Sequence, residues 1–341
     1  MSPKFKWIPC MVIGFFMASN TIMQGQCYDF YGMTSDGGND NGGTIFRTTG
    51  YGDSLSTCYS AVINAEGTSP YGQLCKADNG KFYGTTYSGG INYVGVLFEW
   101  APSTNNYIKK HDFDGTNTGG WPQGSLMQAL NGKLYGVTQY GGSHNCGVLF
   151  EWDPETDVFT KKIDCGIYWA NPWGNLVQAN NGKIYGTTLA GGNYNMGLIF
   201  AWDPESNVME EVFSFDGTEI GNGFTGSLVK DASGHLYGMT SQGGANDLGV
   251  LFELNPESGA ITKKMDFSGI ETGSRTYGSL VITAMNKLYG LAGTGGANQL
   301  GTLFEYNLVT DSFSRKFDFD TVNGIHPSRA LIQANNGKLY G

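Results

Sequence analysis

The sequence predicts an all-β fold, a β-propeller built from four-stranded blades of about 50 residues. Three observations predict it. The 341 residues include 53 glycines, apolar runs last four to six residues before a turn residue interrupts them, and one motif returns at a nearly constant interval. Short apolar runs separated by turn residues are typical of many short strands. We therefore expect almost no helix.

An aromatic–glycine pair marks the repeat. The pair follows an apolar or aromatic residue and recurs at Tyr31, Tyr83, Tyr135, Tyr185, Tyr237, Tyr289 and Tyr340. The successive separations are 52, 52, 50, 52, 52 and 51 residues. Self-similarity at such a period is the signature of a repeat architecture, and this interval is the size of one propeller blade.

One unit shows how each blade is built from four strands. A first strand at 124–129 ends at an Asn-Gly pair, which favours a two-residue hairpin whose central residues both have positive φ. The second strand, 133–138, leads into a Gly-Gly pair, and an Asp-Pro-Glu turn separates the third strand, 148–152, from the fourth, 158–163. The third strand is apolar on both faces except for one glutamate. Such a strand is expected where blades pack face to face.

Counting the units predicts six blades, or seven in a longer native chain. Complete units start near Gly72, Gly124, Gly174, Gly226 and Gly278. The N-terminal part supplies strands two to four of another unit, and Arg329 to Gly341 supplies strands one and two. Six blades result if Arg329 to Ala334 closes against the N-terminal strands. Because the sequence stops inside the motif, we expect a protein truncated at its C-terminus.

Residues 1–25 are predicted to be a secretory signal peptide. Lys4 and Lys6 precede an apolar run from Trp7 to Ala18, and a polar stretch follows. The run is too short to span a bilayer and no other segment is a candidate, so we expect no transmembrane segment in the mature chain, residues 27–341. The protein is thus expected to be secreted, either extracellular or on the cell surface.

Charge and cysteine content limit the partners. Without the two N-terminal lysines the formal net charge goes from −10 to −12, and no basic stripe is present. Nucleic acid and an anionic membrane surface are therefore not expected as partners.

Five cysteines remain without a Cys-x-x-Cys pair, so they do not indicate a zinc site. Cys146 and Cys165 fall in one repeat, where they could form a disulfide or act as small buried hydrophobic side chains.

The repeat resembles that of the GloVer tandem-repeat family of secreted bacterial proteins. The family unit reads approximately Leu-Tyr-Gly-x-Thr, a Gly-Gly pair and then Gly-x-Leu-Phe. Each full unit from Tyr31 onward is similar to it, for instance residues 134–150 and 236–252, with Ala292 in place of the threonine in one unit. The order from Lys133 to Thr156 is also similar to kelch repeats. This resemblance implies a secreted or surface-anchored protein of unestablished activity.

The longer loops on one face of the blades are the predicted binding surface. In an antiparallel four-stranded blade, the loops between strands two and three share a face with the connectors between blades, and such loops usually bind partners. Three residues before each first strand, one position differs from repeat to repeat. It holds Ser69, Trp121, Asn171, Gly223, Arg275 and His326. This variation indicates either a rim specialised blade by blade or neutral drift of a loop.

Side chains on this face are the predicted ligand-binding residues. They are Trp121, Tyr140, His144, Trp169, Trp173, Tyr194, Arg275 and His326. The aromatic members, together with Tyr277, offer platforms on which sugar rings can stack. Packing between blades is the alternative interpretation of the same aromatic residues.

No cofactor is expected, and calcium is the one weak candidate. Asp112 and Asp114 are spaced carboxylates that supply hard oxygen ligands. Their spacing does not reach that of a dedicated Ca²⁺ loop, so ordinary Asp-Gly turns are the favoured interpretation. The four histidines lie at unequal places in their repeats, and no hydrolase or metalloprotease motif organises them. We therefore assign no catalytic residue.

These observations predict a binding module whose partner is an extracellular glycan, a protein or a component of the cell envelope. One alternative is a hydrolase or lyase that acts on extracellular glycans. Such an enzyme needs a carboxyl pair that the order of residues in the sequence does not reveal. The other alternative is a purely structural repeat protein.

Overall fold

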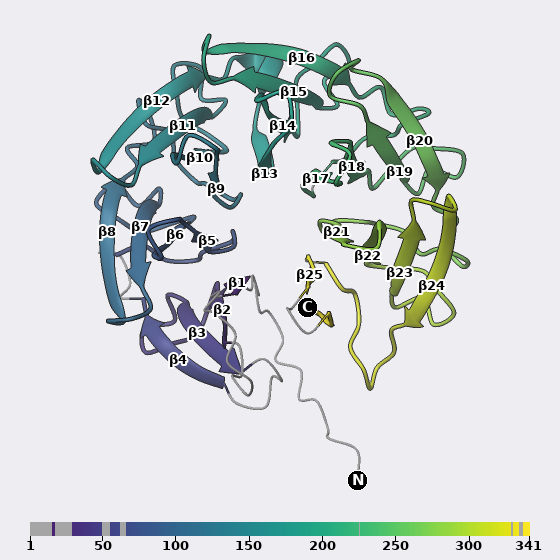
Figure 1. Cartoon of the computed structure of the whole chain (residues 1–341), viewed down its shortest axis with the longest axis horizontal. Helices are drawn as coiled ribbons and strands as arrows, with labels where there is room; N and C mark the ends of the chain where they lie inside the picture. The colour runs from purple at the N-terminus through teal and green to yellow at the C-terminus, as the bar shows by residue number, and fades with distance from the viewer. Residues whose placement is uncertain are drawn as a thin grey trace. The chain divides into compact units, whose positions relative to one another are not determined.

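The computed structural model describes residues 29–49, 55–61, 66–224, 226–328, 330–333 and 337–341, together with a short strand at Phe16–Met17. These residues form six four-stranded sheets and one two-stranded sheet (Figure 1). Helix is confined, in this part of the chain, to the single 3-10 turn η1 (Ile167–Trp169). The predicted all-β fold of propeller blades is confirmed.

Each blade consists of four strands that follow one another in the chain and pair in that order (Figure 1). The first two blades are β1 (Phe16–Met17), β2 (Asp29–Thr34), β3 (Thr44–Thr49), β4 (Leu55–Ser60), and β5 (Cys75–Lys76), β6 (Phe82–Thr85), β7 (Val96–Ala101), β8 (Asn106–Asp112). The third and fourth are β9 (Met127–Gln128), β10 (Leu134–Val137), β11 (Val148–Asp153), β12 (Val158–Asp164), and β13 (Pro172–Gln178), β14 (Ile184–Thr188), β15 (Leu198–Asp203), β16 (Val208–Ser214). The last two are β17 (Val229–Lys230), β18 (Leu236–Met239), β19 (Val250–Leu254), β20 (Ile261–Asp266), and β21 (Val281–Thr283), β22 (Lys287–Ala292), β23 (Thr302–Asn307), β24 (Ser312–Asp318).

The chain comprises two compact units. The C-terminal unit is Val177–Leu331, and the N-terminal unit contains the strands before it together with Ile332–Gly341. In the N-terminal unit the strands β25 (Ile332–Gln333) and β26 (Leu339–Tyr340) pair with each other, and the Tyr340 ring lies 5.2 Å from the Phe30 ring of β2. The C-terminal segment thus packs against the first blade. The strand that pairs with β2 in this blade is β1 and not a C-terminal strand.

The predicted signal peptide, residues 1–25, lies outside the described residues apart from the two residues of β1. It therefore stays a prediction. Of the cysteines expected in the mature chain, Cys27 also lies outside the described residues.

The glycine of the recurrent aromatic–glycine pair leaves room for an aromatic ring of strand three. Gly136 of β10 lies opposite Phe150 of β11. A β-carbon at Gly136 would lie 2.5 Å from Cζ of Phe150, closer than real contacts allow. The equivalent glycines 84, 238 and 290 meet an equivalent phenylalanine at 2.4 to 2.6 Å. The motif therefore recurs because an aromatic ring covers each of these glycines.

The hairpins between strands one and two differ from the prediction. Ala129 and Lys133 are joined by a backbone hydrogen bond of 2.9 Å, which leaves three residues in the loop instead of two. Gly132 has a φ of +79°, whereas Asn131 does not have positive φ. The two-residue hairpin was therefore wrong, because one extra residue lets a glycine alone take the left-handed conformation. The Asn131 side chain instead donates to the Tyr135 hydroxyl (2.9 Å).

The glutamate of the third strand is the centre of an ion-pair network. Glu151 is 6% exposed. Its carboxylate accepts a hydrogen bond from the Tyr135 hydroxyl (2.8 Å) and pairs with Lys133 (2.9 Å) and Lys162 (3.5 Å). Lys162 is the extra residue at a register shift between β11 and β12, and such a bulge redirects a side chain. Equivalent networks surround Glu99, Glu253 and Glu305.

The fourth blade lacks both the glutamate and the bulge lysine of this network. Ala201 stands at the glutamate position, and Val212 stands at the position of the bulge lysine. The Tyr185 hydroxyl donates to the Pro256 carbonyl (3.1 Å), and Lys183 pairs with Glu210. Removing the anion and the cation together avoids leaving a buried charge without its counter-charge. The lysine at the bulge is thus a partner of the glutamate.

We expect acid to destabilise the blades through these glutamates. Burial raises the pKa of Glu99, Glu151 and Glu305, but hydrogen bonds from lysine and tyrosine outweigh it and hold each pKa below its ordinary value. A lowered folded pKa means that the stabilisation is present above the unfolded pKa, about 4.3. It is lost as the pH falls further through the folded pKa. Urea-unfolding midpoints measured from neutral pH downward should hold and then fall below this value. A constant midpoint throughout would contradict the assignment.

Candidate ligand-binding surface

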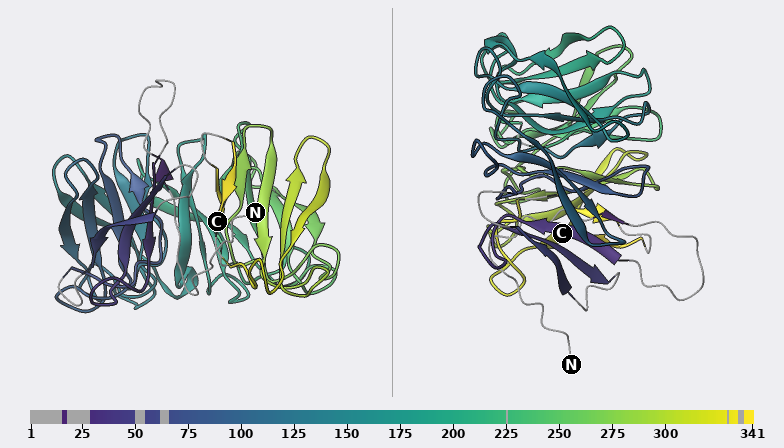
Figure 2. Two further views of the ribbon diagram at one scale, coloured as in Figure 1. Left: turned by 90° about the horizontal axis from the view of Figure 1, so that it is seen from below. Right: turned by 90° about the vertical axis from the view of Figure 1, so that its left-hand side faces the viewer.

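The loops between strands two and three meet the inter-blade connectors at one end of the blade, through the backbone bridges Thr68–Ser88, Gly120–Tyr140, Asn222–Gln242 and Ser274–Thr294. Figure 2 gives two side views of the ribbon. In the second blade, the Phe113 N–H donates to the Gly95 carbonyl (3.1 Å) and the Trp121 N–H donates to the Val94 carbonyl (2.7 Å). The connector is therefore tied at two points to the β6–β7 loop of its own blade. Side chains from both segments are thereby held in fixed positions next to one another.

The variable position before each first strand has the same unusual backbone in every connector. Its φ lies between +52° and +69° in Ser69, Trp121, Asn171, Gly223, Arg275 and His326. Glycine adopts this left-handed conformation at no steric cost, whereas other residues lose roughly 1–2 kcal/mol there. Only Gly223 is glycine. Asn171 and His326 are of residue types that are enriched in this conformation, so the backbone strain is clearest at Ser69, Trp121 and Arg275.

Four aromatic side chains gather at this end of the N-terminal unit. We call them the aromatic cluster: Tyr71, Tyr87, Trp121 and Tyr140. The Trp121 and Tyr140 rings meet edge to face with centroids 5.9 Å apart, and the Tyr71 and Tyr87 rings do so at 5.2 Å. Burial raises the pKa of Tyr87, and the nearby Tyr140 and Tyr71 act in the same direction, which links the two ring pairs. All four side chains are half-buried, so each keeps a solvent-facing part.

Amide groups lie beside the cluster. Gln123 donates through Nε2 to Oε1 of Gln139 (2.6 Å), and Asn171 donates through Nδ2 to the Gln139 backbone carbonyl (3.2 Å). The Gln139 N–H in turn donates to the Trp121 carbonyl (3.4 Å). Gln139 is only 8% exposed, so its amide is held firmly. The surface thus combines apolar ring faces with positioned amide donors and acceptors.

Of the predicted binding residues, the structure brings Trp121 and Tyr140 together. Sequence reasoning missed Tyr71, Tyr87, Gln123 and Gln139. A signal for them exists in the repeat. Two further positions also vary between units, the second residue after the left-handed one and the fourth residue after the tyrosine of each Tyr-Gly pair. Comparing those positions would have pointed to these four side chains.

The other candidates of the N-terminal unit lie elsewhere on the same end. Trp169 belongs to η1 and packs edge to face on Tyr168 at 5.5 Å. His144 is exposed in the β10–β11 loop, and Trp173 is half-buried in β13. Among the described residues, no ring contact joins Trp169 or His144 to the aromatic cluster.

In the C-terminal unit, the structure brings Arg275 and His326 close to one shared residue. The Gly293 N–H donates to the Arg275 carbonyl (3.1 Å), and the Gly293 carbonyl lies 2.9 Å from Nδ1 of His326. Both side chains are exposed. Tyr194, in the β14–β15 loop, is 60% exposed. These three residues remain candidates on the surface of this unit.

The two aspartates proposed as calcium ligands are engaged by protein groups, Asp112 by the β6–β7 loop and by Lys109, and Asp114 by its own turn. Asp112 accepts hydrogen bonds from the Ile91 N–H (2.8 Å) and from Lys109 (3.0 Å). Burial raises the pKa of Asp114, but N–H groups of Thr118 and Thr116 outweigh it and lower the pKa. Within the described ranges, no group of three or more His, Cys, Asp or Glu side chains could hold a metal ion. The Asp-Gly turn is the interpretation that these contacts favour.

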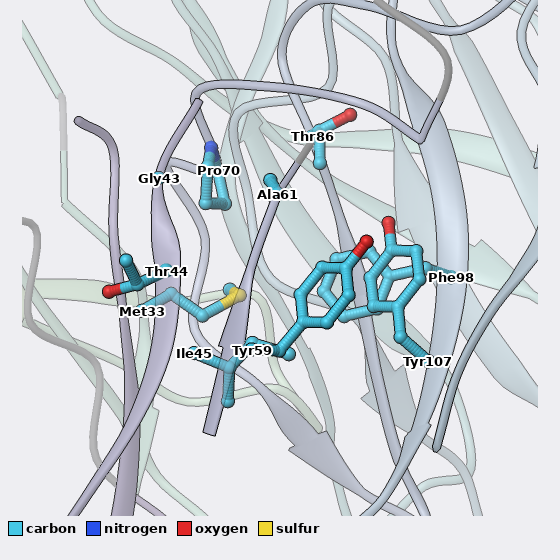
Figure 3. Close-up of a pocket in the computed structure, with 10 residues that line it drawn as sticks. All are labelled: Met33, Gly43, Thr44, Ile45, Tyr59, Ala61, Pro70, Thr86, Phe98 and Tyr107. Carbon is cyan, nitrogen blue, oxygen red and sulfur yellow. The ribbon is translucent and has the colours of Figure 1, made fainter. Parts of the chain in front are cut away.

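A cavity of about 20 Å³ between β3 and β7 offers no ligand site (Figure 3). Its wall includes Met33, Phe98 and the stacked rings of Tyr59 and Tyr107, whose centroids are 4.2 Å apart. A space of this volume holds one water molecule at most. We regard it as a packing gap between the first two blades.

The repeat that forms the blades also identifies the family of the chain. The sequence pattern of the Gloeobacter/Verrucomicrobia repeat matches residues 16–168 and again residues 166–341. The chain belongs to this repeat family. No curated protein matches it. In the described part of this Gloeobacter/Verrucomicrobia repeat protein, no helix has the length and apolar character needed to cross a membrane.

Solved structures similar to this repeat protein share its fold at low sequence identity. The extracellular domain of BT4673 from B. thetaiotaomicron has a TM-score of 0.63 at 14% identity over 99% of this chain and 38% of that one. A chain of the nidogen/laminin complex has 0.52 at 14% over 84% and 96%. The puromycin-hydrolyzing peptidase of Mycobacterium tuberculosis has 0.53 at 10% over 89% and 44%. The chain spans well under two thirds of the BT4673 protein, and at these identities the likeness shows the fold alone.

Proposed function

We propose that this repeat protein is a secreted or cell-surface binding module, and that its ligand is a glycan held at the aromatic cluster. One observation carries the proposal. Trp121 occupies a strained left-handed position with its ring against Tyr140 and its backbone bonded to Gln139. Glycine would remove the strain, and we infer that the indole offsets that cost by contacting a ligand.

The chemistry of the cluster suits a sugar ring. The apolar face of a pyranose stacks on an aromatic ring, and its hydroxyls need donors and acceptors at fixed positions. The cluster supplies half-buried rings, and Gln123 and Gln139 supply the amides. Tryptophan and tyrosine also dominate binding energy at protein surfaces because they present a large, stiff contact area.

Two observations support a location outside the cell. The sequence predicts a signal peptide in residues 1–25. The fold is shared with the extracellular domain of BT4673. Loops at one end of a rigid repeat scaffold are a common place for binding partners in such proteins.

The test replaces Trp121 with glycine, the residue that the fifth blade has at the same position. We expect the variant to bind a glycan array more weakly than the wild-type protein. Its affinity for the best glycan, measured by calorimetry, should fall at least about tenfold, or ~1.4 kcal/mol. The melting temperature should change little, because the packing lost with the indole is offset by release of the strained backbone. Measurements with Ca²⁺ and with chelator should agree.

The matched control is Trp169→Ala, which removes an indole of the same end outside the cluster and should leave binding unchanged. An array without any bound glycan would contradict the proposal and favour a protein partner. Equal affinity of the wild-type protein and the Trp121→Gly variant would remove the aromatic cluster from the site. Cleaved product in the assay would favour the glycan-active enzyme.

A further inference from the structure

The third blade replaces an apolar pair by two cysteines. One position precedes the glycine before strand three, and the other follows strand four. The first position holds Val94, Met196, Leu248 and Leu300 in four of the other blades, and the second holds Phe113, Phe215, Phe267 and Phe319. The third blade has Cys146 and Cys165 there instead. An aliphatic or methionine side chain at the first position and a phenylalanine ring at the second are exchanged together.

The blade geometry places these two positions against each other. The Cys165 N–H donates to the carbonyl of Gly147, the residue next to Cys146 (2.9 Å). The first blade has the same bond, from Ala61 to Gly43 (3.0 Å). There the equivalent of Cys146 is Gly42, and a β-carbon on Gly42 would lie 3.4 Å from the β-carbon of Ala61. Disulfides join β-carbons that are about 3.5–4.5 Å apart.

The third blade also lacks a hydrogen bond that other blades use at this place. In three blades an asparagine of the strand-two to strand-three loop donates to the carbonyl of the phenylalanine after strand four. The pairs are Asn92 with Phe113 (2.8 Å), Asn246 with Phe267 (2.9 Å) and Asn298 with Phe319 (3.0 Å). His144 stands at the asparagine position in the third blade and is exposed. A bond between the cysteines would tie the same loop to the same strand end.

We propose that Cys146 and Cys165 form a disulfide in the exported protein. The two thiols lose two protons and two electrons as the S–S bond forms. A disulfide-bearing oxidant of the oxidising compartment, such as a thiol–disulfide oxidoreductase or glutathione disulfide, takes up the electrons and becomes a dithiol or two thiols. The proposal rests on export but not on glycan binding, so it can fail or hold independently of the aromatic cluster.

Both groups are free thiols in the structure and both are buried. Burial raises the pKa of the Cys165 thiol to about 12, and the neighbouring Cys146 acts in the same direction. Little Cys165 thiolate is therefore present in the closed blade, and the thiolate is the reacting form. The bond should therefore form while the blade folds, and it should resist reduction in the native protein.

The experiment refolds the chain with either glutathione disulfide or reduced glutathione and maps its peptides after alkylation under denaturing conditions. We expect the oxidised sample to contain a linked Cys146–Cys165 peptide pair that is two hydrogens lighter than the two thiol peptides. Its unfolding midpoint should lie several degrees above that of the reduced sample. Alkylated Cys146 and Cys165 in the oxidised sample, or linkage of either to another cysteine, would overturn the proposal.

The matched control is the double variant Cys146→Val, Cys165→Phe, which installs the pair found in the second blade. It should fold in either glutathione buffer with the same midpoint, because it has lost the bond but regained the packing. A variant with Cys58→Ser and Cys75→Ser should keep the full shift. If the redox shift persists in the Val/Phe variant, another pair of cysteines is responsible and the proposal is wrong.

Discussion

Replacing Gly147 with alanine should destabilise the protein by at least about 3 kcal/mol, or prevent folding. Gly147 precedes strand three, has a φ of +101°, and directs its missing β-carbon at backbone. That carbon would lie 2.3 Å from the carbonyl oxygen of Thr138 and 2.8 Å from Cδ of Pro172. The oxygen belongs to the strand-two end of the same blade and cannot move without opening the loop. Strain at φ and a backbone clash therefore act together.

The control is Gly132→Ala in the hairpin of the same blade. Gly132 also has positive φ, +79°, but a β-carbon there would meet nothing within 4 Å. Only the conformational cost remains, so we expect a loss of about 1 kcal/mol. Denaturant unfolding of both variants measures the difference. Equal losses at the two sites would show that the close approach at Gly147 relaxes without cost.

Replacing Glu151 with alanine should cost about 3 kcal/mol. The variant leaves Lys162 and Lys133 without the carboxylate that pairs with both, and removes the acceptor of the Tyr135 hydroxyl. Lys133 is about two fifths exposed and can turn to solvent, whereas the side chain of Lys162 is more enclosed. We therefore expect the low end of the range measured for breaking buried pairs. The unfolding free energy in urea measures it.

The fourth blade supplies the compensating changes. A triple variant, Glu151→Ala with Lys162→Val and Thr160→Glu, installs in the third blade the residues at the positions of Ala201, Val212 and Glu210. The new glutamate gives Lys133 a partner as Glu210 does for Lys183. We expect the triple variant to recover more than half of the lost stability. If it is as unstable as Glu151→Ala alone, the fourth blade depends on neighbours that this exchange does not carry over.

The fold could be predicted from the sequence because its information is local and repeated. Turn residues at a constant interval define where strands end, and a period near 52 residues defines the blade. The third and fourth strands of the third blade, predicted at 148–152 and 158–163, are observed at Val148–Asp153 and Val158–Asp164. The hairpin loop was the exception, since one inserted residue changes which side chain needs positive φ.

The candidate site was only partly predictable. The left-handed position is visible in the sequence because its residue differs from repeat to repeat. That position indicates Trp121, and the neighbouring loop indicates Tyr140. Tyr71 and Tyr87 lie about 50 residues before Trp121 and Tyr140 in the sequence, one repeat apart. Their nearness depends on how one blade meets the next. Contacts of that kind are not encoded in any single repeat.

The sequence by itself therefore determined the blade, its strand order and the face that carries the long loops, because each follows from short-range hydrogen bonding and from the side-chain pattern of one unit. Only the tertiary structure decided which variable residues meet. It grouped four aromatic rings in the N-terminal unit, turned Asp112 toward the Ile91 N–H of the β6–β7 loop and Asp114 toward N–H groups of its own turn, and set Cys146 beside the segment of Cys165. The ring grouping depends on packing between segments one repeat apart, whereas the aspartate and cysteine contacts form within one blade, where the fold brings a loop against a strand end.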